Sequence, residues 1–430
     1  MKLFKKGSKK LMNAWAFYDW ANSVYPLVIS SSIFPIYYGL IFSSKGIKSI
    51  LFLGFNFKNS ALISFVSAAA FLVVAIISPL LSGIADFIGN KKKFMQFFCF
   101  LGAFSCIGLS FLTTDTIYFG IACYFFGLIG FWGSVVFYNS YLPDIAFVDQ
   151  QDKLSAKGYS LGYIGSVILL LLNLFFIIGK NEQESIVAMQ YSFISVGVWW
   201  IVFSQYTFYY LPNGNATSNK LTKAIVFNGF NELKKVWILL NQNIRLKKYL
   251  TAFFVYSMAV QTVMLIATYF GEQEVSWVSN SEKTSGLIIS ILVIQLVAIL
   301  GAVLTSKASA KFGNISVLIV INSIWVFICL AAYFVTLPLH FYITAAFVGL
   351  VMGGIQSLSR STYSKFLPES NDTTSFFSFY DVSEKVGIVI GMSIYGIIDQ
   401  ITGSMRTAIV FIAVFFVGGL ILLFKVPKKD

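Results

Sequence analysis

The sequence predicts an all-α membrane protein with twelve transmembrane helices in two six-helix, pseudo-symmetric halves. Hydrophobic residues make up 57% of the 430 residues and charged residues only 11%, whereas about a quarter of the residues in a soluble domain are charged. Apolar runs that reach the roughly 20 residues needed to cross a bilayer recur along the chain. The net charge of +13 lies between these runs, where it favours anionic lipid headgroups. We therefore expect the lipid bilayer as a partner and no nucleic-acid binding.

The spans follow one another once the chain is cut at its polar breaks. The first apolar run contains Asp19 and Asn22 in place of a small-residue cleavage site, so it is a spanning helix and not a signal peptide. A polar, basic stretch follows the sixth span. It predicts an N-terminal half of residues 1–211, a cytoplasmic basic amphipathic linker of residues 212–248 and a C-terminal half of residues 249–430. We expect spans near 14–42, 61–82, 94–113, 117–139, 158–179, 189–211, 249–270, 284–306, 315–336, 341–361, 376–398 and 405–425.

The positions of lysine and arginine predict the orientation of the spans. With both termini in the cytoplasm, the expected cytoplasmic segments hold 24 of the 31 Lys and Arg residues, which is the bias that the positive-inside rule describes. The first outer loop, with Lys45, Lys48 and Lys58, is an exception that the rule does not explain.

The linker has the pattern of a helix that lies on the membrane surface. Its apolar residues recur at helical spacing, with lysines on the other faces. A helix that binds a calmodulin-type partner has a similar pattern and is the alternative. The apolar residues are Leu233, Val236, Trp237, Leu240 and Ile244.

A repeated motif supports two equivalent halves. Residues Tyr138–Asp144, after the fourth span, and Tyr363–Glu369, after the tenth, both read Tyr-x-x-aromatic-Leu-Pro-acid. Fourth and tenth spans are equivalent if the halves are related by an axis along the membrane normal. A chance similarity in an aromatic-rich chain is the alternative.

The segment from Gly83 to Lys93, GIADFIGNKKK, predicts a conformational hinge between the second and third spans. Gly83 and Gly89 permit a close backbone approach or a sharp turn. Asp86 lies between them, and Lys91 begins a basic run suited to cytoplasmic headgroups.

Polar side chains inside the spans are the candidates for function, because an ionisable group at the bilayer centre costs about 2.5–3.5 kcal/mol and rarely faces lipid. In the first span, Asp19, Asn22, Ser23 and Pro26 share one helical face. We expect that face to look into the helix bundle and to serve solute binding or coupling. The alternative is that Asp19 only complements the positive end of its own helix.

The eleventh span carries Asp381, Glu384 and Lys385. Asp381 and Lys385 stand four residues apart and can pair on one face. Glu384 would then have to find another partner or be protonated. Because desolvation favours the protonated form of a carboxyl group, we expect Glu384 to carry a coupling proton. An ion pair that ties this helix to a neighbour is the structural alternative.

Three further polar residues belong to the expected solute or proton pathway. Gln356 and Arg360 stand four residues apart at the end of the tenth span, and Gln261 lies in the seventh. Arg360 suits a carboxylate or phosphate of the solute, although pairing with Glu384 or reaching the headgroups explains it as well. The glutamines are candidates for hydrogen bonds to the solute.

The residue patterns of common enzyme sites do not occur. His340 is the only histidine, and there is no Gly-x-x-x-x-Gly-Lys-Ser/Thr phosphate loop. The four cysteines lie inside apolar runs, where thiols behave as small hydrophobes. We therefore expect no catalytic residue, no metal site and no cofactor, and any pumping would use a gradient rather than ATP.

Five stretches together resemble one branch of the major facilitator superfamily. This vacuole-effluxer-like family includes a fungal autophagy-related amino-acid effluxer and many bacterial members. The chain departs from the family pattern at Met258–Ala259, where many relatives have an acidic or amide residue and a glycine. It departs again at Lys307–Gly313, the repeat of the hinge, which lacks the aspartate. The resemblance covers most of the chain and rests on Trp15–Ser23, Gly83–Lys93, Tyr138–Asp144, Val260–Thr262 and Gly354–Ser361.

The resemblance implies a secondary active transporter of the major facilitator fold, a symporter or antiporter that moves a small polar solute by alternating access. It lends weight to amino acids or similar small polar metabolites as cargo, and we expect efflux as the direction. Glu384 in the eleventh span is the reason to expect proton coupling. We also expect a bacterial inner (plasma) membrane and a monomer. The resemblance also implies that Asp86 approaches the amino end of the eleventh helix, near Thr374 and Ser375, and holds one access state closed. A non-transporting membrane sensor or scaffold with the same fold is the alternative, against which the charged residues inside the spans argue.

Overall fold

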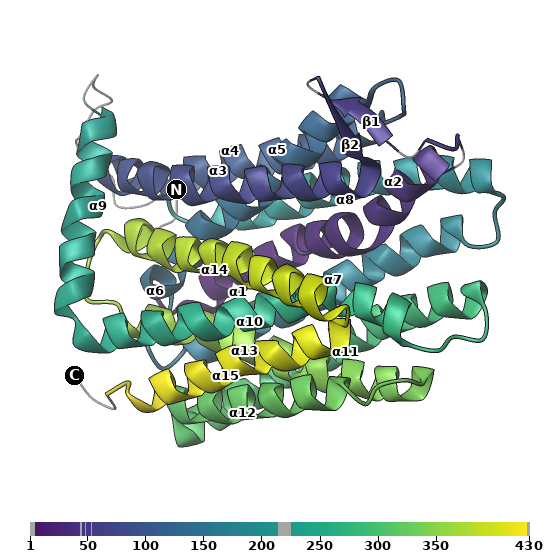
Figure 1. The fold of residues 1–430 in the computed structure, drawn as a ribbon. Helices are drawn as coiled ribbons and strands as arrows, with labels where there is room; N and C mark the ends of the chain where they lie inside the picture. Colours follow the sequence, from purple (N-terminus) through teal and green to yellow (C-terminus); the bar gives the residue numbers. More distant parts are fainter. Residues whose placement is uncertain (1–4, 44, 48, 53, 214–224, 428–430) are drawn as a thin grey trace. The chain divides into compact units, whose positions relative to one another are not determined.

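The computed structural model describes residues 5–43, 45–47, 49–52, 54–213 and 225–427. Twelve helical spans in these residues are long and apolar enough to cross a membrane, which confirms the predicted all-α membrane fold. Figure 1 shows the helices and one short hairpin. The elements are α1 Lys9–Asn22, the π-helix η1 Tyr25–Ser32, α2 Ile33–Ser43, β1 Ser49–Phe52, β2 Phe55–Lys58, α3 Asn59–Ile88, α4 Lys91–Leu109, α5 Ile117–Ser140, α6 Leu142–Ile145, α7 Gln151–Ile177, α8 Glu182–Tyr210, α9 Ile225–Gln242, α10 Ile244–Glu274, α11 Asn280–Phe312, α12 Asn314–Ala332, α13 Pro338–Phe366, α14 Thr373–Thr402 and α15 Met405–Phe424.

Several helices begin before the apolar runs, where polar residues cap their starts. The α8 helix begins at Glu182, where the side chain of Asn181 accepts a 2.9 Å hydrogen bond from the backbone N–H of Glu184. Ser279 caps the start of α11 in the same way, accepting from the N–H of Glu282 at 3.1 Å. Such caps satisfy backbone donors that have no partner inside the helix, so the helix can start in polar surroundings.

The first span, expected near residues 14–42, is found over Lys9–Phe42, but its helix is not regular throughout. It consists of α1, the eight-residue π-helix η1 and α2. Pro26 lies in the first turn of η1, and proline lacks the N–H that a regular helix would use at this point. The break therefore follows from a residue that had been assigned only to the polar face.

A small antiparallel hairpin follows the first span and was not predicted. Strands β1 and β2 pair with Ser49 opposite Lys58 and Ile50 opposite Phe57. Gly54 takes a φ of +82° next to β2, a conformation that glycine adopts without steric cost. The alternation in these strands is too short to separate from a loop in the sequence alone.

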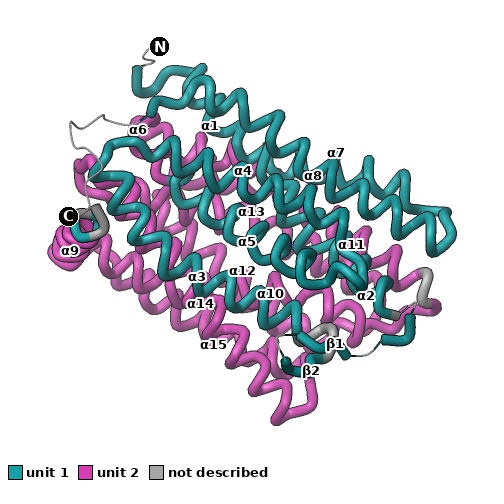
Figure 2. Tube along the Cα trace, turned by 90° about the horizontal axis from the view of Figure 1, so that it is seen from above, with its two compact units in different colours: residues 1–139, 161–229 teal, residues 140–160, 230–430 magenta. Residues whose placement is uncertain are grey.

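The residues divide into two compact units, shown in Figure 2. Unit 1 comprises residues 1–139 and 161–229, and within it α8 packs on both α1 and α4. Unit 2 comprises residues 140–160 and 230–430, and within it α11 packs on α13, and α10 packs on α14 and α15. The segment 140–160, which ends α5, carries α6 and begins α7, thus clusters with helices of the second half. The domain boundaries expected at 211 and 249 remain a prediction.

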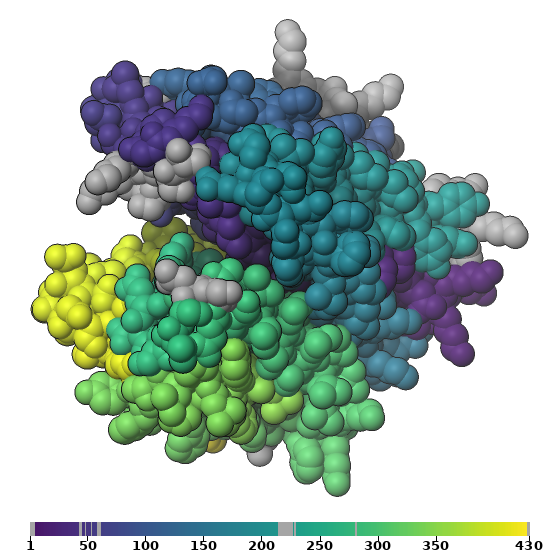
Figure 3. All heavy atoms as spheres, turned by 90° about the vertical axis from the view of Figure 1, so that its right-hand side faces the viewer, coloured from purple at the N-terminus to yellow at the C-terminus, as the bar shows by residue number. Residues whose placement is uncertain are grey.

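Small residues bring helices together inside each unit. A Cβ atom on Gly353 of α13 would lie 2.0 Å from the carbonyl oxygen of Ala298 on α11. In unit 1, a Cβ atom on Gly130 of α5 would lie 2.3 Å from the backbone nitrogen of Gly102 on α4. Close contacts of this kind are a common way to join membrane helices. In Figure 3 the yellow atoms of α14 and α15 lie against the green atoms of their unit 2 neighbours.

Candidate functional site

Asp19 is held inside unit 1 by two aromatic residues. The residue is 7% exposed, and its carboxylate accepts a 2.8 Å hydrogen bond from the hydroxyl of Tyr138 on α5. Trp15, one turn earlier on α1, stacks on the Tyr138 ring at 4.5 Å and donates its indole N–H to the Tyr138 carbonyl oxygen at 2.8 Å. The motif of the first span and the first copy of the repeated motif therefore meet, and together they orient the carboxylate.

Asn22 is buried on the same helix, and its side-chain amide N–H is not used by the described residues. The residue is 1% exposed, and its Nδ2 has no hydrogen-bond partner among the described residues. Its Oδ1 accepts from the hydroxyl of Ser23 at 3.3 Å. Helix α7 approaches closely here, since a Cβ atom on Gly162 would lie 2.4 Å from Ser23 Oγ. A buried amide donor without a partner is suited to an acceptor such as a carboxylate oxygen or a water.

Lys385 joins two carboxylates inside unit 2. On α14 its Nζ lies 2.9 Å from Asp381 Oδ1 and 2.9 Å from Glu384 Oε2, and its side chain is 1% exposed. Gln261 of α10 donates its amide N–H to Glu384 Oε1 at 2.7 Å. The second oxygen of Asp381, Oδ2, is buried and has no hydrogen-bond partner in the described part of the chain. We call Gln261, Asp381, Glu384 and Lys385 the α14 cluster.

The α14 cluster corrects the expectation that Glu384 is left without a partner. Lys385 does not neutralise Asp381 alone, because its ammonium group reaches the adjacent Glu384 as well as Asp381 one turn away. The helical spacing indicated only the pair that is four residues apart. The carboxylate oxygen without a partner belongs to Asp381 instead.

Arg360 lies inside unit 2 and does not extend to the headgroups. The residue is 2% exposed, and its Nε and one terminal nitrogen donate to Ser155 Oγ at 2.9 Å and to the Ser155 carbonyl oxygen at 3.0 Å. Its guanidinium group lies 4.2 Å above the ring of Tyr159. These contacts favour the structural interpretation, in which Arg360 fastens the start of α7 to α13. One turn earlier, Gln356 donates to Met264 Sδ at 3.6 Å.

Asp152, which the sequence did not single out, is the centre of a second buried polar group. The residue is 6% exposed in the first turn of α7. It accepts hydrogen bonds from Ser309 Oγ and Asn314 Nδ2, both at 2.9 Å, and forms an ion pair with Lys365. An acid in the first turn of a helix is common because of the helix dipole, so the pattern gave no specific signal. We call Asp152, Ser309, Asn314 and Lys365 the Asp152 cluster.

The hinge residues act at two different places. Gly89 has a φ of +69° and makes the turn between α3 and α4. Gly83 lies inside α3, where a Cβ atom would meet the carbonyl oxygen of Gly229 at 2.3 Å. The expected sharp turn is therefore present at Gly89 and the expected close approach at Gly83, and their role as a conformational hinge remains a prediction. Asp86 lies in the last turn of α3, half-buried, and its approach to the start of α14 remains a prediction.

The lysines of the hinge correct one expectation. Lys91 and Lys92 are each only 5% exposed, whereas Lys93 is exposed. Lys92 donates to the carbonyl oxygen of Leu211 at 2.9 Å, just after the end of α8. An unsatisfied carbonyl group at a helix end attracts a cation. Lys91 and Lys92 therefore pack inside the protein instead of pointing to the headgroups.

In the described part of the linker, α9 lies across the end of α14 (Figure 1), and α10 already begins at Ile244. Val236 and Leu240 are buried, but Trp237 is 52% exposed, so the five predicted apolar residues do not all face the same way. Lys235 bonds Asp372, the residue before α14, at 2.9 Å. This hydrogen bond raises the pKa of Lys235 above its usual value, so the lysine stays charged at neutral pH.

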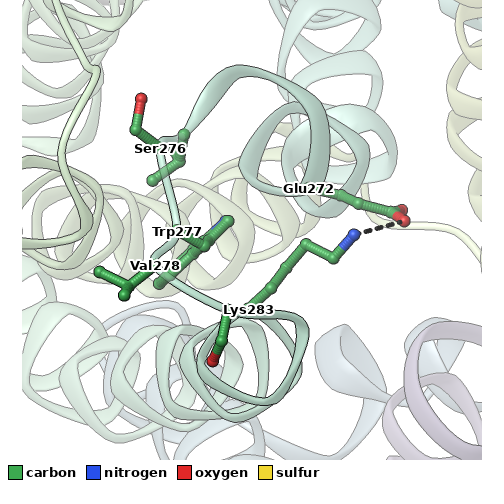
Figure 4. A pocket seen from close by; sticks show the side chains of 7 residues that line it. Glu272, Ser276, Trp277, Val278 and Lys283 are labelled. Carbon is green, nitrogen blue, oxygen red and sulfur yellow. Dashed lines mark ion pairs between the residues drawn. The ribbon is translucent and has the colours of Figure 1, made fainter.

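A shallow depression of about 460 Å³ lies where α10 ends and α11 begins (Figure 4). Glu272 and Lys283 form a 3.7 Å ion pair across it, and both side chains are too exposed for a strong interaction. No group of three or more His, Cys, Asp and Glu residues that could hold a metal ion occurs in the described ranges. The depression is lined by Glu272, Val275, Ser276, Trp277, Val278, Ser279 and Lys283.

Comparison with known proteins assigns both halves of the chain to one family model. The model described as "Vacuole effluxer Atg22 like" matches residues 7–149 and 146–430. An uncharacterized MFS-type transporter, YxiO of Bacillus subtilis, is 30% identical over 430 residues, which cover 98% of this chain and 95% of that protein. Autophagy-related protein 22 of Saccharomyces cerevisiae is 25% identical over 414 residues, covering 82% of this chain and 75% of that protein.

Solved structures share the fold at low sequence identity. A proton:xylose symporter, XylE, bound to 6-bromo-6-deoxy-D-glucose, aligns with a TM-score of 0.74 and 13% identity, covering 98% of this chain and 96% of that one. FucP in the outward conformation aligns with a TM-score of 0.68 and 13% identity, covering 98% and 99% of the two chains. Both are described as major facilitator superfamily proteins.

Proposed function

Because the chain belongs to the vacuole-effluxer-like family of major facilitator transporters, we propose that it is a secondary active transporter that exports a small polar solute in exchange for protons. Its relatives are transporters, so the chain is a membrane transporter and not an enzyme. The α14 cluster is the observation that supports proton coupling. Amino acids are the first cargo to test, because the family description names an effluxer and the spans offer amide and carboxylate groups.

The charge of the α14 cluster favours the uptake of one proton. Two carboxylates and one ammonium group give a net charge of −1 when all three are ionised. A net charge in surroundings this buried is costly, and one added proton would make the cluster neutral. Lys385 shares its charge between Asp381 and Glu384, so the proton belongs to the pair of acids rather than to a single one.

Glu384 is the acid through which the proton would enter and leave. Its side chain is 17% exposed, against 6% for Asp381. Gln261 donates to Glu384 Oε1 at 2.7 Å and thereby holds this carboxyl group in place. A cargo that displaced the Gln261 amide would release the carboxyl group from this contact, which would link cargo movement to the group that carries the proton.

Each unit contains a buried polar atom that is suited to a polar group of a solute. In unit 1, Asn22 has a donor without a partner among the described residues, which suits a carboxylate oxygen. In unit 2, considered by itself, Asp381 Oδ2 is an acceptor that suits an ammonium group. In the proposed orientation both termini are cytoplasmic, α9 lies against anionic headgroups of a bacterial plasma membrane, and the protein acts as a monomer.

The test measures cargo movement in proteoliposomes of the purified full chain. Wild-type protein should accumulate a labelled amino acid in response to a pH gradient, and Glu384→Gln should abolish this accumulation. Glu384→Gln should keep counterflow, the exchange of labelled for unlabelled cargo, because the amide mimics the protonated acid. Asp381→Asn should reduce accumulation at least as strongly, since it removes the other half of the shared charge.

The matched control is Glu282→Gln, an acid at the start of α11 whose side chain caps its own helix end by accepting from the N–H of Val278. It should accumulate cargo as the wild type does. Glu384→Gln protein that still concentrates cargo with the wild-type pH dependence would remove Glu384 from the proton pathway and leave Asp19 as the leading candidate. A wild type that moves no amino acid, sugar or organic acid in either assay would favour the sensor interpretation.

A further inference from the structure

A second pocket of unit 2 lies where three helix ends meet. It has a volume of about 370 Å³ and is bounded by the end of α9, the start of α10 and the end of α15. In Figure 1 these three helix ends lie at the same end of unit 2. The pocket is separate from the α14 cluster, because the two share no residue. We call it the lysine pocket, and it is lined by Asn241, Ile244, Lys247, Lys248, Thr251, Leu422 and Lys425.

The lysine pocket has positive charge and no acid to balance it. Lys247, Lys248 and Lys425 line it, and none of them forms an ion pair in the part of the chain that the structure describes. Other bases of unit 2 are paired with acids, as in Lys235–Asp372, Lys283–Glu272 and Arg406–Glu274. Three like charges around one pocket repel one another unless an anion lies among them. The lysine pocket is therefore a candidate anion site.

Ammonium groups would hold this anion. The hydroxyl of Thr251 already donates to the carbonyl oxygen of Lys247 at 2.9 Å, and the amide of Asn241 donates to that of Trp237 at 2.9 Å. Most of the remaining donors, and all of the charge, belong to the three lysines. Because lysine binds phosphate as a compact point charge with rotatable donors, a phosphate group suits this lining.

Hydrocarbon next to the lysines favours a lipid over a soluble phosphate. Ile244 at the start of α10 is 63% exposed, and Leu422 lies near the end of α15, three residues before Lys425. The methylene stems of the lysines add further apolar surface. A phospholipid offers a phosphate to the ammonium groups and an acyl chain to these side chains, whereas a soluble phosphate would leave the apolar part of the pocket uncovered.

The lysine pocket also stands at the depth where headgroups are expected. The spans Ile244–Glu274 and Met405–Phe424 place Lys247 and Lys248 near the beginning of one span and Lys425 directly after the other. In the predicted orientation this end is cytoplasmic. Basic pockets between spans on that side of a membrane bind lipids that carry several phosphate charges.

We propose that the lysine pocket binds one anionic phospholipid with two phosphate groups, a lipid of the cardiolipin type. The three ammonium groups carry a charge of +3, and two phosphates balance more of this charge than one phosphate does. The site goes beyond the proposed function, because lipid binding needs neither a cargo nor a proton gradient. A bound lipid would connect the end of the linker helix α9 with the end of α15.

The test titrates lipids onto the purified full chain in detergent and counts bound molecules by native mass spectrometry. The wild type should bind cardiolipin more tightly than phosphatidylglycerol, and phosphatidylethanolamine least. Lys247→Gln, Lys248→Gln and Lys425→Gln should each weaken cardiolipin binding about fivefold, as expected for one lysine at an anionic surface. By mass action, cardiolipin should also raise the melting temperature of the wild type more than that of the triple variant.

A charge-matched control separates the lysine pocket from general surface charge. Lys307 and Lys311 are exposed at the end of α11 and do not line the pocket. The double variant Lys307→Gln/Lys311→Gln therefore loses the same charge as Lys247→Gln/Lys248→Gln, but it should bind cardiolipin as the wild type does.

A second variant tests the space rather than the charge. Thr251→Trp keeps all three lysines and fills the lysine pocket, so it should weaken cardiolipin binding about as much as the loss of one lysine. Thr251 is exposed, and the melting temperature without lipid should stay at the wild-type value.

The proposal fails if the α11 double variant loses cardiolipin as strongly as the α10 double variant, because the lysines would then act only through general charge. It also fails if Thr251→Trp binds cardiolipin as the wild type does, since the lipid would then lie elsewhere. Glycerol phosphate that displaced the lipid at equal concentration would make the pocket a site for a soluble anion instead. Binding is measured without cargo, so a failed transport assay would overturn the proposed function and not this site.

Discussion

Three polar residues show when the partner of a buried polar group can be predicted from the sequence and when it cannot. Asp19 was expected to face protein, and its contact with Tyr138 agrees with that expectation. Lys385 was assigned to one acid because only the spacing within its helix could be counted, whereas its flexible side chain reaches two. Asp152 gave no signal, since each of its partners lies more than 150 residues away in sequence.

Tyr138→Phe should destabilise the protein by removing the hydroxyl donor from a buried carboxylate. Hydrogen bonds to charged groups contribute about 1.5–3 kcal/mol, so the free energy of unfolding should fall by that amount. The measurement is thermal or denaturant unfolding of the purified protein in detergent.

The control for this substitution is Tyr209→Phe. Tyr209 is 74% exposed, and the phenylalanine ring can keep the contact that the tyrosine ring makes with Tyr210. It should change stability little. Equal stability of the two variants would show that the Tyr138 hydroxyl contributes nothing to holding Asp19.

At the scale of elements, hydropathy predicted which segments are helices but not where the helices end. Apolar length marks the part inside hydrocarbon, whereas caps such as Asn181 and Ser279 set the ends in polar surroundings. The β1–β2 hairpin, the short helix α6 and the π-helix η1 were missed because each is too short to produce a periodic pattern.

Gly83→Ala should weaken the packing of α9 on α3. The added Cβ would lie 2.3 Å from a backbone oxygen of Gly229, and backbone cannot move aside as a side-chain tip can. Overpacking of this kind costs about 1–3 kcal/mol, so the melting temperature should fall. Gly39→Ala in α2 has nothing within 4 Å of its added Cβ and should be neutral or slightly stabilising, because alanine favours helix. A Gly83→Ala protein as stable as Gly39→Ala would mean that the two backbones are not in contact.

The fold of the whole molecule can be predicted from the composition more directly than any of its sites can. Apolar runs of this length span lipid as helices, which satisfy their own backbone hydrogen bonds, and twelve such spans occur among the residues that the structure describes. The membership of segment 140–160 in unit 2 could not be predicted. It depends on side-chain contacts between distant parts of the chain, and the hydrophobic pattern does not encode them.

The orientation predicted by the lysines and arginines can be tested with two exposed asparagines. Asn56 lies in the hairpin after the first span and Asn231 in α9, and both are exposed. In a chain without native cysteines, Asn56→Cys should react with an impermeant reagent in intact cells, and Asn231→Cys only after the cells are opened. The positive-inside rule is the physical reason. The opposite pattern would invert the orientation, and reaction of both from outside would contradict the odd number of spans, five, that lie between them among the described residues.

The π-helix in the first span affects how the facing of a side chain can be predicted from the facing of residues earlier in the same span. Each residue of a π-helix turns less about the axis than a residue of an α-helix does, because the hydrogen bond reaches one residue further. Over Tyr25–Ser32 the directions of the side chains therefore fall out of phase with those of α1. A heptad or helical wheel drawn from Asp19 through to Tyr37 would place the later residues on the wrong side. The side-chain directions of α1 therefore do not continue into α2 beyond η1. The facing of a residue in α2 has to be worked out from α2 alone when substitutions are planned there.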